Sequence, residues 1–197
     1  KGKTAALAVP EIEKACKQRG ASYEIHLTSC AGDGETYTRK MAESTSEPLR
    51  VYACGGDGTL YDVVNGAIGH DHVEVASVPL GSGNDFIRLF GDREMFSDIG
   101  AQMDGKTTLL DAIWCNGKYA INQCSMGFDA NVCDKQASFK KLPWLKGESA
   151  YVASLLYCFI KKMENTFTIS IDDGPAETMK VLFAYVGNSR WYGGGFM

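Results

Sequence analysis

The stretch ACGGDGTLYDVVNG, residues 53–66, decides the fold of this chain. Three glycines flank the carboxylate of Asp57, directly after an apolar run that ends at Cys54. Glycine lacks a Cβ, so it permits a tight turn and lets a ligand come close to backbone N–H groups. Because Asp57 is itself an anion, a phosphate here would be repelled unless a metal ion or a proton lay between them. The stretch predicts a strand, a ligand-binding turn and then a helix.

Strands and helices alternate along the first half of the chain. Composition and helical spacing predict helices at 3–19, 34–44, 59–69 and from 82 onward. Apolar runs and alternating patterns predict strands at 23–28, 49–55 and 73–81. Such an alternation of elements predicts an α/β domain with a mostly parallel sheet.

The pattern becomes β-rich after Gly105. The β-rich segments are 107–115, 119–132, 166–173 and 179–187, and a helix is expected over 149–163. Asn116-Gly117 is a strong signal for a two-residue hairpin, and Asp173-Gly174 is a weaker one. We therefore expect two domains, an α/β domain over 1–105 and a mainly antiparallel β domain over 106–197.

Composition excludes some classes of protein. The net charge of −4 and the pI near 5.4 argue against a nucleic-acid binder with a broad basic surface. The seven cysteines are odd in number and scattered, with no C-x-x-C pair, which is typical of reduced thiols in a cytosolic protein. The longest apolar run, residues 151–160, is too short to span a bilayer. The three histidines have no metal-ligand spacing.

A second turn, PLGSGNDF at residues 79–86, repeats the architecture of the first. Each turn places glycines, a hydroxyl and an aspartate at the carboxyl end of a strand and before a helix. Ligands of open α/β sheets bind outside these carboxyl ends, so the two turns are expected to line one crevice. The alternative is that both are ordinary turns whose polar side chains cap the following helices. The capping candidates are Asp57 or Thr59 and Asn84 or Asp85.

The two turns together resemble those of the diacylglycerol kinase catalytic-domain family, which includes bacterial lipid kinases and sphingosine kinases. The resemblance continues in KGK at the start, in residues 108–132 and in the glycine segment of residues 186–197. It implies an α/β nucleotide-binding domain of the NAD kinase and diacylglycerol kinase type, followed by a β-sandwich domain, with ATP and Mg²⁺ between them.

The resemblance also assigns roles to individual residues. It implies nucleotide contacts by Thr28, Gly55, Gly56, Asp57, Gly58, Thr59, Leu60, Tyr61, Asp62, Gly81, Ser82, Gly83 and Asn84. It implies catalytic roles for Asp57 and Asp85, and places Asp57, Asp85 and Asp111 around the metal ion. Carboxylates near a triphosphate are reasonable where they hold Mg²⁺ directly or through its waters.

The chain departs from the family pattern in three places. Tyr61 stands where the family usually has Asn, which puts contacts to the ribose or the phosphates in question. The family's N-P-x-x-G phosphate loop would precede Lys1. The acidic segment with the expected general base would follow Met197.

The stretch SFKKLPWLKGES, residues 138–149, combines basic and aromatic residues. Its side chains suit contact with anionic lipid headgroups through Phe139, Leu142, Trp144, Leu145, Lys140, Lys141 and Lys146. An ordinary exposed loop is the alternative. The stretch YGGGF, residues 192–196, is interpreted as a hinge.

The leading hypothesis is an ATP-dependent lipid kinase that phosphorylates diacylglycerol or a related lipid at a membrane surface. We expect a cytoplasmic protein, peripheral at the inner face of the membrane, without a nucleic-acid partner; a homodimer is left open. One alternative is a NAD kinase-like or other small-molecule kinase, because those families also carry GGDGT. The other is a nucleotide- or lipid-binding module without turnover.

Overall fold

The computed structural model describes residues 2–91, 93–139, 144, 148–161, 165–191 and 193. The chain divides into two compact units. The first consists of Lys1–Asn122 with Gly187–Met197, and the second of Gln123–Val186. The first compact unit continues past residue 105 to Asn122, and the division into domains over 1–105 and 106–197 stays a prediction.

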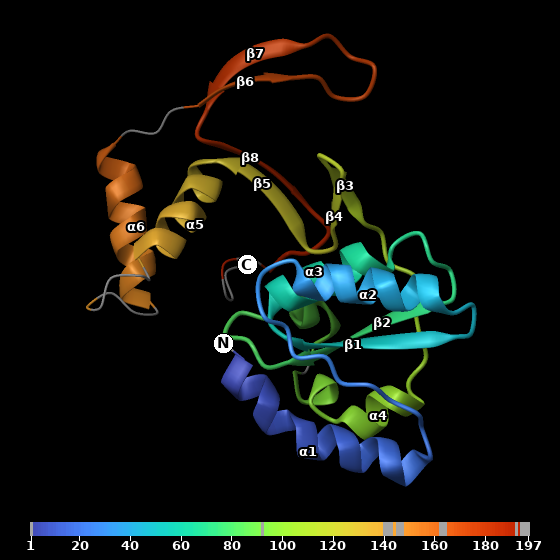
Figure 1. Ribbon diagram of the computed structural model, residues 1–197. Coiled ribbons are helices and arrows are strands. Elements are labelled where there is room, and N and C mark those ends of the chain that lie inside the picture. Colours follow the sequence, from blue (N-terminus) through green and yellow to red (C-terminus); the bar gives the residue numbers. More distant parts are fainter. Residues whose placement is uncertain are drawn as a thin grey trace. The chain divides into compact units, whose positions relative to one another are not determined.

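The first unit is a three-layer α/β structure (Figure 1). Its central layer is a parallel pair of strands, in which Leu49 lies opposite Val73 and Gly55 opposite Pro79. Helices cover both faces of this pair. The elements are α1 (Gly2–Arg19), α2 (Asp33–Ser44), β1 (Leu49–Gly55), α3 (Asp57–Ala67), β2 (Val73–Pro79), η1 (Phe86–Phe90), η2 (Arg93–Phe96) and α4 (Ile99–Asp104).

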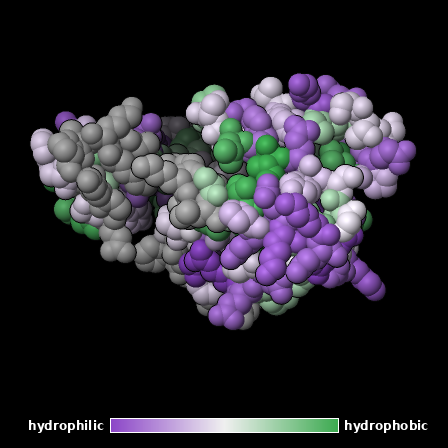
Figure 2. Space-filling view, turned by 60° about the horizontal axis from the view of Figure 1, so that its bottom comes forward, coloured by the Kyte–Doolittle hydropathy of each residue, from purple (hydrophilic) through white to green (hydrophobic). Residues whose placement is uncertain are grey.

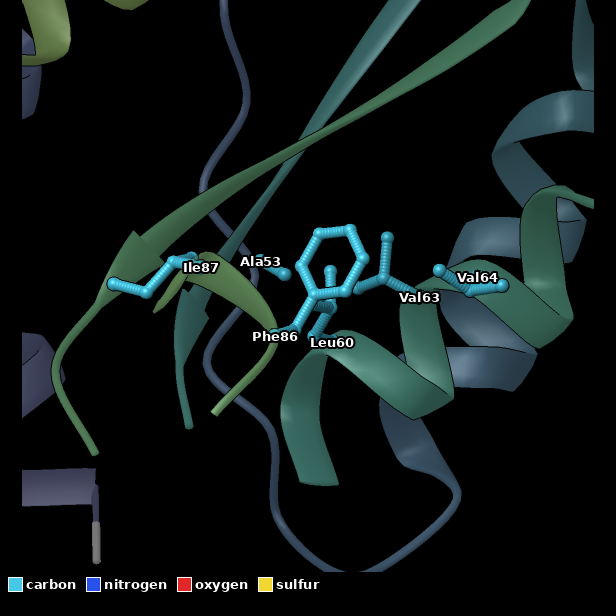
Figure 3. Close-up of a cluster of buried hydrophobic side chains, with 6 residues drawn as sticks. All are labelled: Ala53, Leu60, Val63, Val64, Phe86 and Ile87. Atoms are coloured by element: carbon cyan, nitrogen blue, oxygen red, sulfur yellow. The ribbon is translucent and has the colours of Figure 1, made fainter. Parts of the chain in front are cut away.

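The main hydrophobic core lies between the strands and α3. Helix α3 contributes Leu60, Val63 and Val64, which are spaced at one helical turn and are all buried. The side chains of Ala53 from β1 and of Phe86 and Ile87 from the second turn complete the cluster (Figure 3). A smaller cluster of Ala15, Val78 and Ile99 lies on the side of α1 and α4. The core therefore fixes the start of α3 and the second turn relative to the strands.

A β-hairpin, β3 (Ile113–Cys115) and β4 (Lys118–Ala120), completes the described part of the first unit. Asn116 and Gly117 have φ angles of 49° and 78°, as a two-residue hairpin turn requires, so the predicted hairpin is confirmed. Asn65 of α3 holds the hairpin. Its amide nitrogen donates to the Tyr119 carbonyl at 2.9 Å, and its oxygen accepts from the Tyr119 N–H at 2.9 Å. These bonds place the hairpin in the first compact unit, beyond the predicted boundary.

The second unit combines two packed helices with short strands. Its elements are β5 (Gln123–Gly127), α5 (Phe128–Phe139), α6 (Glu148–Ile160), β6 (Asn165–Ile169), β7 (Glu177–Val181) and β8 (Phe183–Gly187). Helices α5 and α6 pack together, and Ala150, Ser154 and Cys158 of α6 are fully buried. Strands β6 and β7 form an antiparallel hairpin, and β5 pairs with β8. This part is β-rich, as predicted, but it also holds a helix that the sequence analysis missed.

Three predictions of secondary structure are wrong. Residues 23–28 form no strand, because Tyr23, Ile25 and Leu27 are all exposed and their backbone pairs with no strand of the described chain. The segment 128–132 was expected to be β but opens α5, since Gly127 has a φ of 95° and ends the strand. The expected helix after residue 82 is the short 3₁₀ helix η1. The parallel pairing of β1 with β2 is confirmed, whereas a larger parallel sheet and a β-sandwich stay predictions.

The other elements of the first unit are close to prediction. Helix α1 contains Pro10 and still runs unbroken to Arg19. Helices α2 and α3 and strands β1 and β2 begin and end within two residues of the predicted bounds. All seven cysteines are free, as expected. In the part of the chain that the structure describes, no helix combines the length and the apolar character needed to cross a bilayer.

Candidate active site

The two glycine turns meet. A Cβ built on Gly81 would overlap Cα of Gly56, and it would lie 3.0 Å from the Gly56 nitrogen. Such a backbone approach leaves no room for any side chain at Gly81. The turns therefore share one place at the carboxyl ends of the parallel strands β1 and β2, as the sequence analysis predicted.

Backbone hydrogen bonds join the turns. The Gly55 carbonyl accepts from the N–H groups of Leu80 at 2.8 Å and Gly81 at 3.1 Å. Within the second turn, the Asn84 side chain closes a ring with Gly81, accepting from its N–H at 3.2 Å and donating to its carbonyl at 2.6 Å. Asn84 is buried and has a φ of 54°, which Asn tolerates better than most residues. Asn84 therefore shapes the turn, and its predicted contact with a nucleotide stays a prediction.

The first turn leads directly into α3 and leaves the start of that helix without a side-chain cap. Gly56 is the N-cap residue, and its carbonyl accepts from Thr59 at 3.0 Å and Leu60 at 3.1 Å. No atom would lie within 4 Å of a Cβ at Gly58, so space is open there. An uncapped helix N-terminus beside open space suits the binding of a phosphate.

Asp57 links the two turns as well. Its Oδ1 accepts from the Phe86 N–H at 3.4 Å, a long bond. The carboxylate forms no other hydrogen bond with the described residues, so its second oxygen can serve a ligand. The capping alternative for Asp57 is not what the structure shows, because α3 has no side-chain cap bond.

The three predicted metal ligands do not gather into one site. Asp85 is buried and forms an ion pair with Arg88, with 3.4 Å between Oδ1 and Nε. Asp111 is exposed, and its backbone carbonyl accepts from the Asn188 side chain at 2.7 Å. Among the residues that the structure describes, no three His, Cys, Asp or Glu side chains lie close enough to hold one ion. A site with three direct carboxylate ligands is therefore not formed.

Two further predicted contacts, Thr28 and Asp62, lie beside the start of α2. The Asp62 carboxylate accepts from the Gly32 N–H at 3.0 Å, and Gly32 is the N-cap residue of α2 with a φ of 80°. Thr28 is exposed and lies near the start of α2. Its Cγ2 atom would be 3.8 Å from a Cβ built on Gly34 of that helix. Asp62 therefore has a structural partner, and Thr28 is accessible to a ligand.

The remaining predicted contacts are either packed inside the first unit or accessible at its surface. The side chain of Leu60 is only 5% exposed and belongs to the hydrophobic core, so the nucleotide contact predicted for this residue stays a prediction for its backbone. Thr59 packs over Gly55. Tyr61 and Ser82 are exposed, and Gly83 lines a small cavity beside the second turn.

The thiol of Cys54, at the end of β1, is disfavoured as a nucleophile. Burial raises the pKa of its thiol to about 11, so the thiolate is scarce near neutral pH.

The family model of the "Diacylglycerol kinase catalytic domain" matches residues 1–115, more than half of the chain. The chain belongs to this family. The two turns that meet at Gly56 and Gly81 both lie inside the matched residues.

Curated relatives of the family agree with this assignment. The chain is 28% identical over 204 residues to the "Putative lipid kinase YtlR" of Bacillus subtilis (strain 168), covering 93% of this chain and 64% of that protein. It is 35% identical over 109 residues to the "Diacylglycerol kinase" of the same organism, covering 54% of this chain and 35% of that protein. The chain thus spans less than two thirds of the length of these two relatives.

A solved structure shares the fold. It is titled "A putative diacylglycerol kinase from Bacillus anthracis str. Sterne", with a TM-score of 0.65 and 22% sequence identity. The match covers 98% of this chain and 63% of that chain.

Within this diacylglycerol kinase catalytic domain, sequence reasoning missed two residues that shape the site. Asn65 is 5% exposed and bridges α3 to the β3–β4 hairpin. Arg88 pairs with the predicted catalytic residue Asp85. A signal existed for each: Asn65 is a polar residue amid the apolar positions of a helix, and Arg88 follows GSGNDF at a spacing that suits an i, i+3 ion pair.

Proposed function

We propose that this protein is an ATP-dependent lipid kinase that transfers the γ-phosphate of ATP to a lipid hydroxyl. We propose diacylglycerol as the acceptor and phosphatidic acid as the product. The observation that carries the proposal is the contact of Gly56 with Gly81, because it unites two family turns at one strand edge. Membership of the kinase family supports the class of reaction.

The residues of the two turns would act mainly by positioning. The N-terminus of α3 and the open space at Gly58 would receive phosphate oxygens. Asp57 would face them with its second carboxylate oxygen, while Oδ1 keeps its bond to Phe86. Phosphoryl transfer depends largely on such positioning and on stabilising charge.

The carboxylates of this site suit a magnesium–nucleotide complex in which the protein supplies only one or two ligands of the ion. Mg²⁺ commonly takes one or two carboxylates and fills its remaining positions with waters and phosphates. Asp57 is the residue that would hold it, because Asp85 is paired with Arg88 and Asp111 forms no group of three metal-ligating side chains with described residues. When bound, the ion supplies neutralisation of phosphate charge, which explains how a carboxylate can lie in an anion-binding turn.

The test is phosphate transfer from labelled ATP to diacylglycerol, sphingosine and NAD by the protein with its natural flanking sequence. Transfer to diacylglycerol is expected. Transfer to NAD alone would favour the small-molecule kinase, and nucleotide binding without transfer would favour the binding module. The variant Asp57→Ala should lose transfer by about 100-fold or more. Asp71→Ala, at an exposed turn, is the matched control.

We further propose that the lipid is reached at a membrane surface through the apolar face of α6. This face consists of Val152, Leu156, Phe159 and Ile160, which are 51%, 57%, 72% and 80% exposed. Their spacing places them on one side of the helix, and no charged residue lies between Glu148 and Lys161. An apolar helix face followed by lysines suits the boundary of an anionic bilayer.

Exposed apolar side chains also lie outside α6, among them Leu182, Phe183 and Val186. On the face drawn in Figure 2, hydrophobic side chains interrupt a surface that is otherwise largely hydrophilic. The basic and aromatic stretch 139–146, also predicted to contact lipid, lies mostly outside the described residues; Trp144 within it is 75% exposed. The predicted hinge at 192–196 lies outside them except for Gly193.

Vesicle co-sedimentation tests the contact of α6 with the membrane. The double variant Phe159→Glu and Ile160→Glu should reduce retention on vesicles that contain anionic lipid, while the fold persists because both side chains are largely exposed. The control is Leu109→Glu in the first unit, at a side chain that is 100% exposed. Equal retention of both variants and the unaltered protein would contradict the membrane contact.

A further inference from the structure

A small cavity lies beside the second glycine turn. It measures about 100 Å³ and is lined by Gly83, Asn84, Ile87, Arg88, Gly91 and Arg93. This volume has room for several waters. It is well below the ~300–1,000 Å³ of pockets that enclose a whole drug-sized ligand. The cavity thus matches a group of the size of a phosphate, with the rest of any larger ligand outside.

Arg88 is held in place at the wall of this cavity. Asp85 Oδ1 lies 3.4 Å from its Nε, which is shielded from solvent. A terminal nitrogen donates to the Gly83 carbonyl at 3.4 Å, and the Trp191 ring centre lies 5.8 Å from the guanidinium carbon. A guanidinium fixed on three sides loses little further freedom when it binds an anion.

Arg93 adds a second guanidinium to the same cavity. It donates to the Pro79 carbonyl at 2.9 Å and forms no ion pair with any residue the structure describes. Of the six lining residues only these two arginines are charged, and the ion pair of Asp85 involves Arg88 and not Arg93. Both charged side chains in the lining are therefore cations.

We propose that this cavity binds a phosphate group between Arg88 and Arg93. Arginine forks match the oxygens of phosphate, and two of them give a charge-assisted site. The phosphate can belong to a nucleotide or to a phospholipid headgroup, since both carry the same chemistry. The inference rests on the proposed function, because Gly83 and Asn84 of the same cavity wall are predicted nucleotide contacts, and it adds the two arginines as the groups that bind a phosphate.

A purely structural role explains Arg88 alone but not the pair. The ion pair of Arg88 with Asp85 and its bond to Gly83 would hold the second turn without any ligand. Arg93 is exposed and lies on a different element, η2, yet it lines the same cavity. The convergence of the two arginines is what points to an anion.

The test measures binding of inorganic phosphate by calorimetry to the unaltered protein and to Arg93→Gln. This variant should fold normally, because the side chain is exposed and its described bond is to one carbonyl. A loss of affinity of about tenfold or more is expected, as for removal of a charged hydrogen-bond donor. Arg19→Gln, which breaks the 2.7 Å ion pair with Asp104 elsewhere in the first unit, is the matched control and should bind phosphate unchanged.

Two further arms identify the source of the phosphate. If Arg93→Gln weakens binding of ATP, the group belongs to a nucleotide; if it weakens retention on phosphatidic acid vesicles, the group belongs to a lipid. Phosphate affinity that is equal in unaltered protein, Arg93→Gln and Arg88→Gln would overturn the proposal. The two proposals fail in different assays. If the kinase proposal alone is wrong, calorimetry still shows phosphate binding that depends on Arg93, but no acceptor receives phosphate from ATP.

Discussion

The contact between the two turns makes a sharp prediction for Gly81→Ala. The new methyl group would overlap Cα of Gly56, which is backbone and cannot rotate away. It would also lie 2.9 Å from Asn84 Oδ1, so this oxygen would have to move by about 0.5 Å to reach an ordinary contact of 3.4 Å. The two turns must therefore separate.

The cost can be worked from these contacts. Overpacking of a closely packed place costs about 1–3 kcal/mol. Separation of the turns also weakens the bonds from the N–H groups of Leu80 and Gly81 to the Gly55 carbonyl, at about 0.5–1.5 kcal/mol for one bond lost. Together we expect a loss of about 2–4 kcal/mol in the free energy of unfolding, or roughly 4–16 °C in Tm. ATP affinity should fall with it, since the shared site is distorted.

Gly58→Ala is the matched control within the same motif. A Cβ there would meet no atom within 4 Å, and the residue lies in the first turn of α3. Because Ala is a better helix former than Gly, this variant should be as stable as the unaltered protein or up to about 1 kcal/mol more stable. If a nucleotide occupies the open space at Gly58, its affinity should nevertheless fall.

Thermal unfolding followed by circular dichroism, with calorimetric titration of ATP, checks both variants. A Gly81→Ala protein that unfolds at the unaltered Tm and binds ATP equally well would refute the contact between the turns. Equal losses of stability in the two variants would refute the distinction between a closed and an open glycine.

Three other predictions concern the first unit. Asn65→Ala should free the hairpin and speed hydrogen exchange at the Tyr119 N–H, with a loss of about 1–3 kcal/mol; unchanged exchange would count against the anchor. The Lys118 ammonium holds the pKa of the Glu35 carboxyl below its ordinary 4.5. The ion pair therefore stabilises the fold fully above pH 4.5, and this contribution is lost as the pH falls through the lowered pKa of Glu35. Acid titration of Tm should therefore show a smaller loss below pH 4.5 in Lys118→Gln. Finally, Cys54 should resist iodoacetamide at pH 8 until the protein unfolds, because burial raises its pKa to about 11; early labelling, read by peptide mass, would contradict its burial.

Local patterns were enough to predict several elements and the position of the site. The Asn116-Gly117 pair predicts its hairpin because only a few residues accept positive φ at both turn positions. The strand, glycine turn and helix of residues 53–66 form as predicted, since the buried positions of α3 recur at helical spacing. These features depend on residues that are neighbours along the chain, so they can be predicted from the sequence.

Local patterns misled where long-range contacts decide. Alternation at residues 23–28 indicates a strand, but a strand needs a partner backbone and a core to face, and the exposed Ile25 and Leu27 have neither. Leu60 belongs to the family's nucleotide-binding motif, yet its place on α3 turns its side chain into the core. The motif identifies the segment and not the direction of each side chain.

The sequence by itself determined the family turns, their order and the strand edge at which they lie. Only the tertiary structure decided that Gly56 and Gly81 touch and that Asp85 is paired with Arg88. It also decided that Arg88 and Arg93 share one cavity. The physical reason is that residue type and spacing fix backbone conformation over a few residues, whereas distances between charges and between turns depend on how the helices pack on β1 and β2.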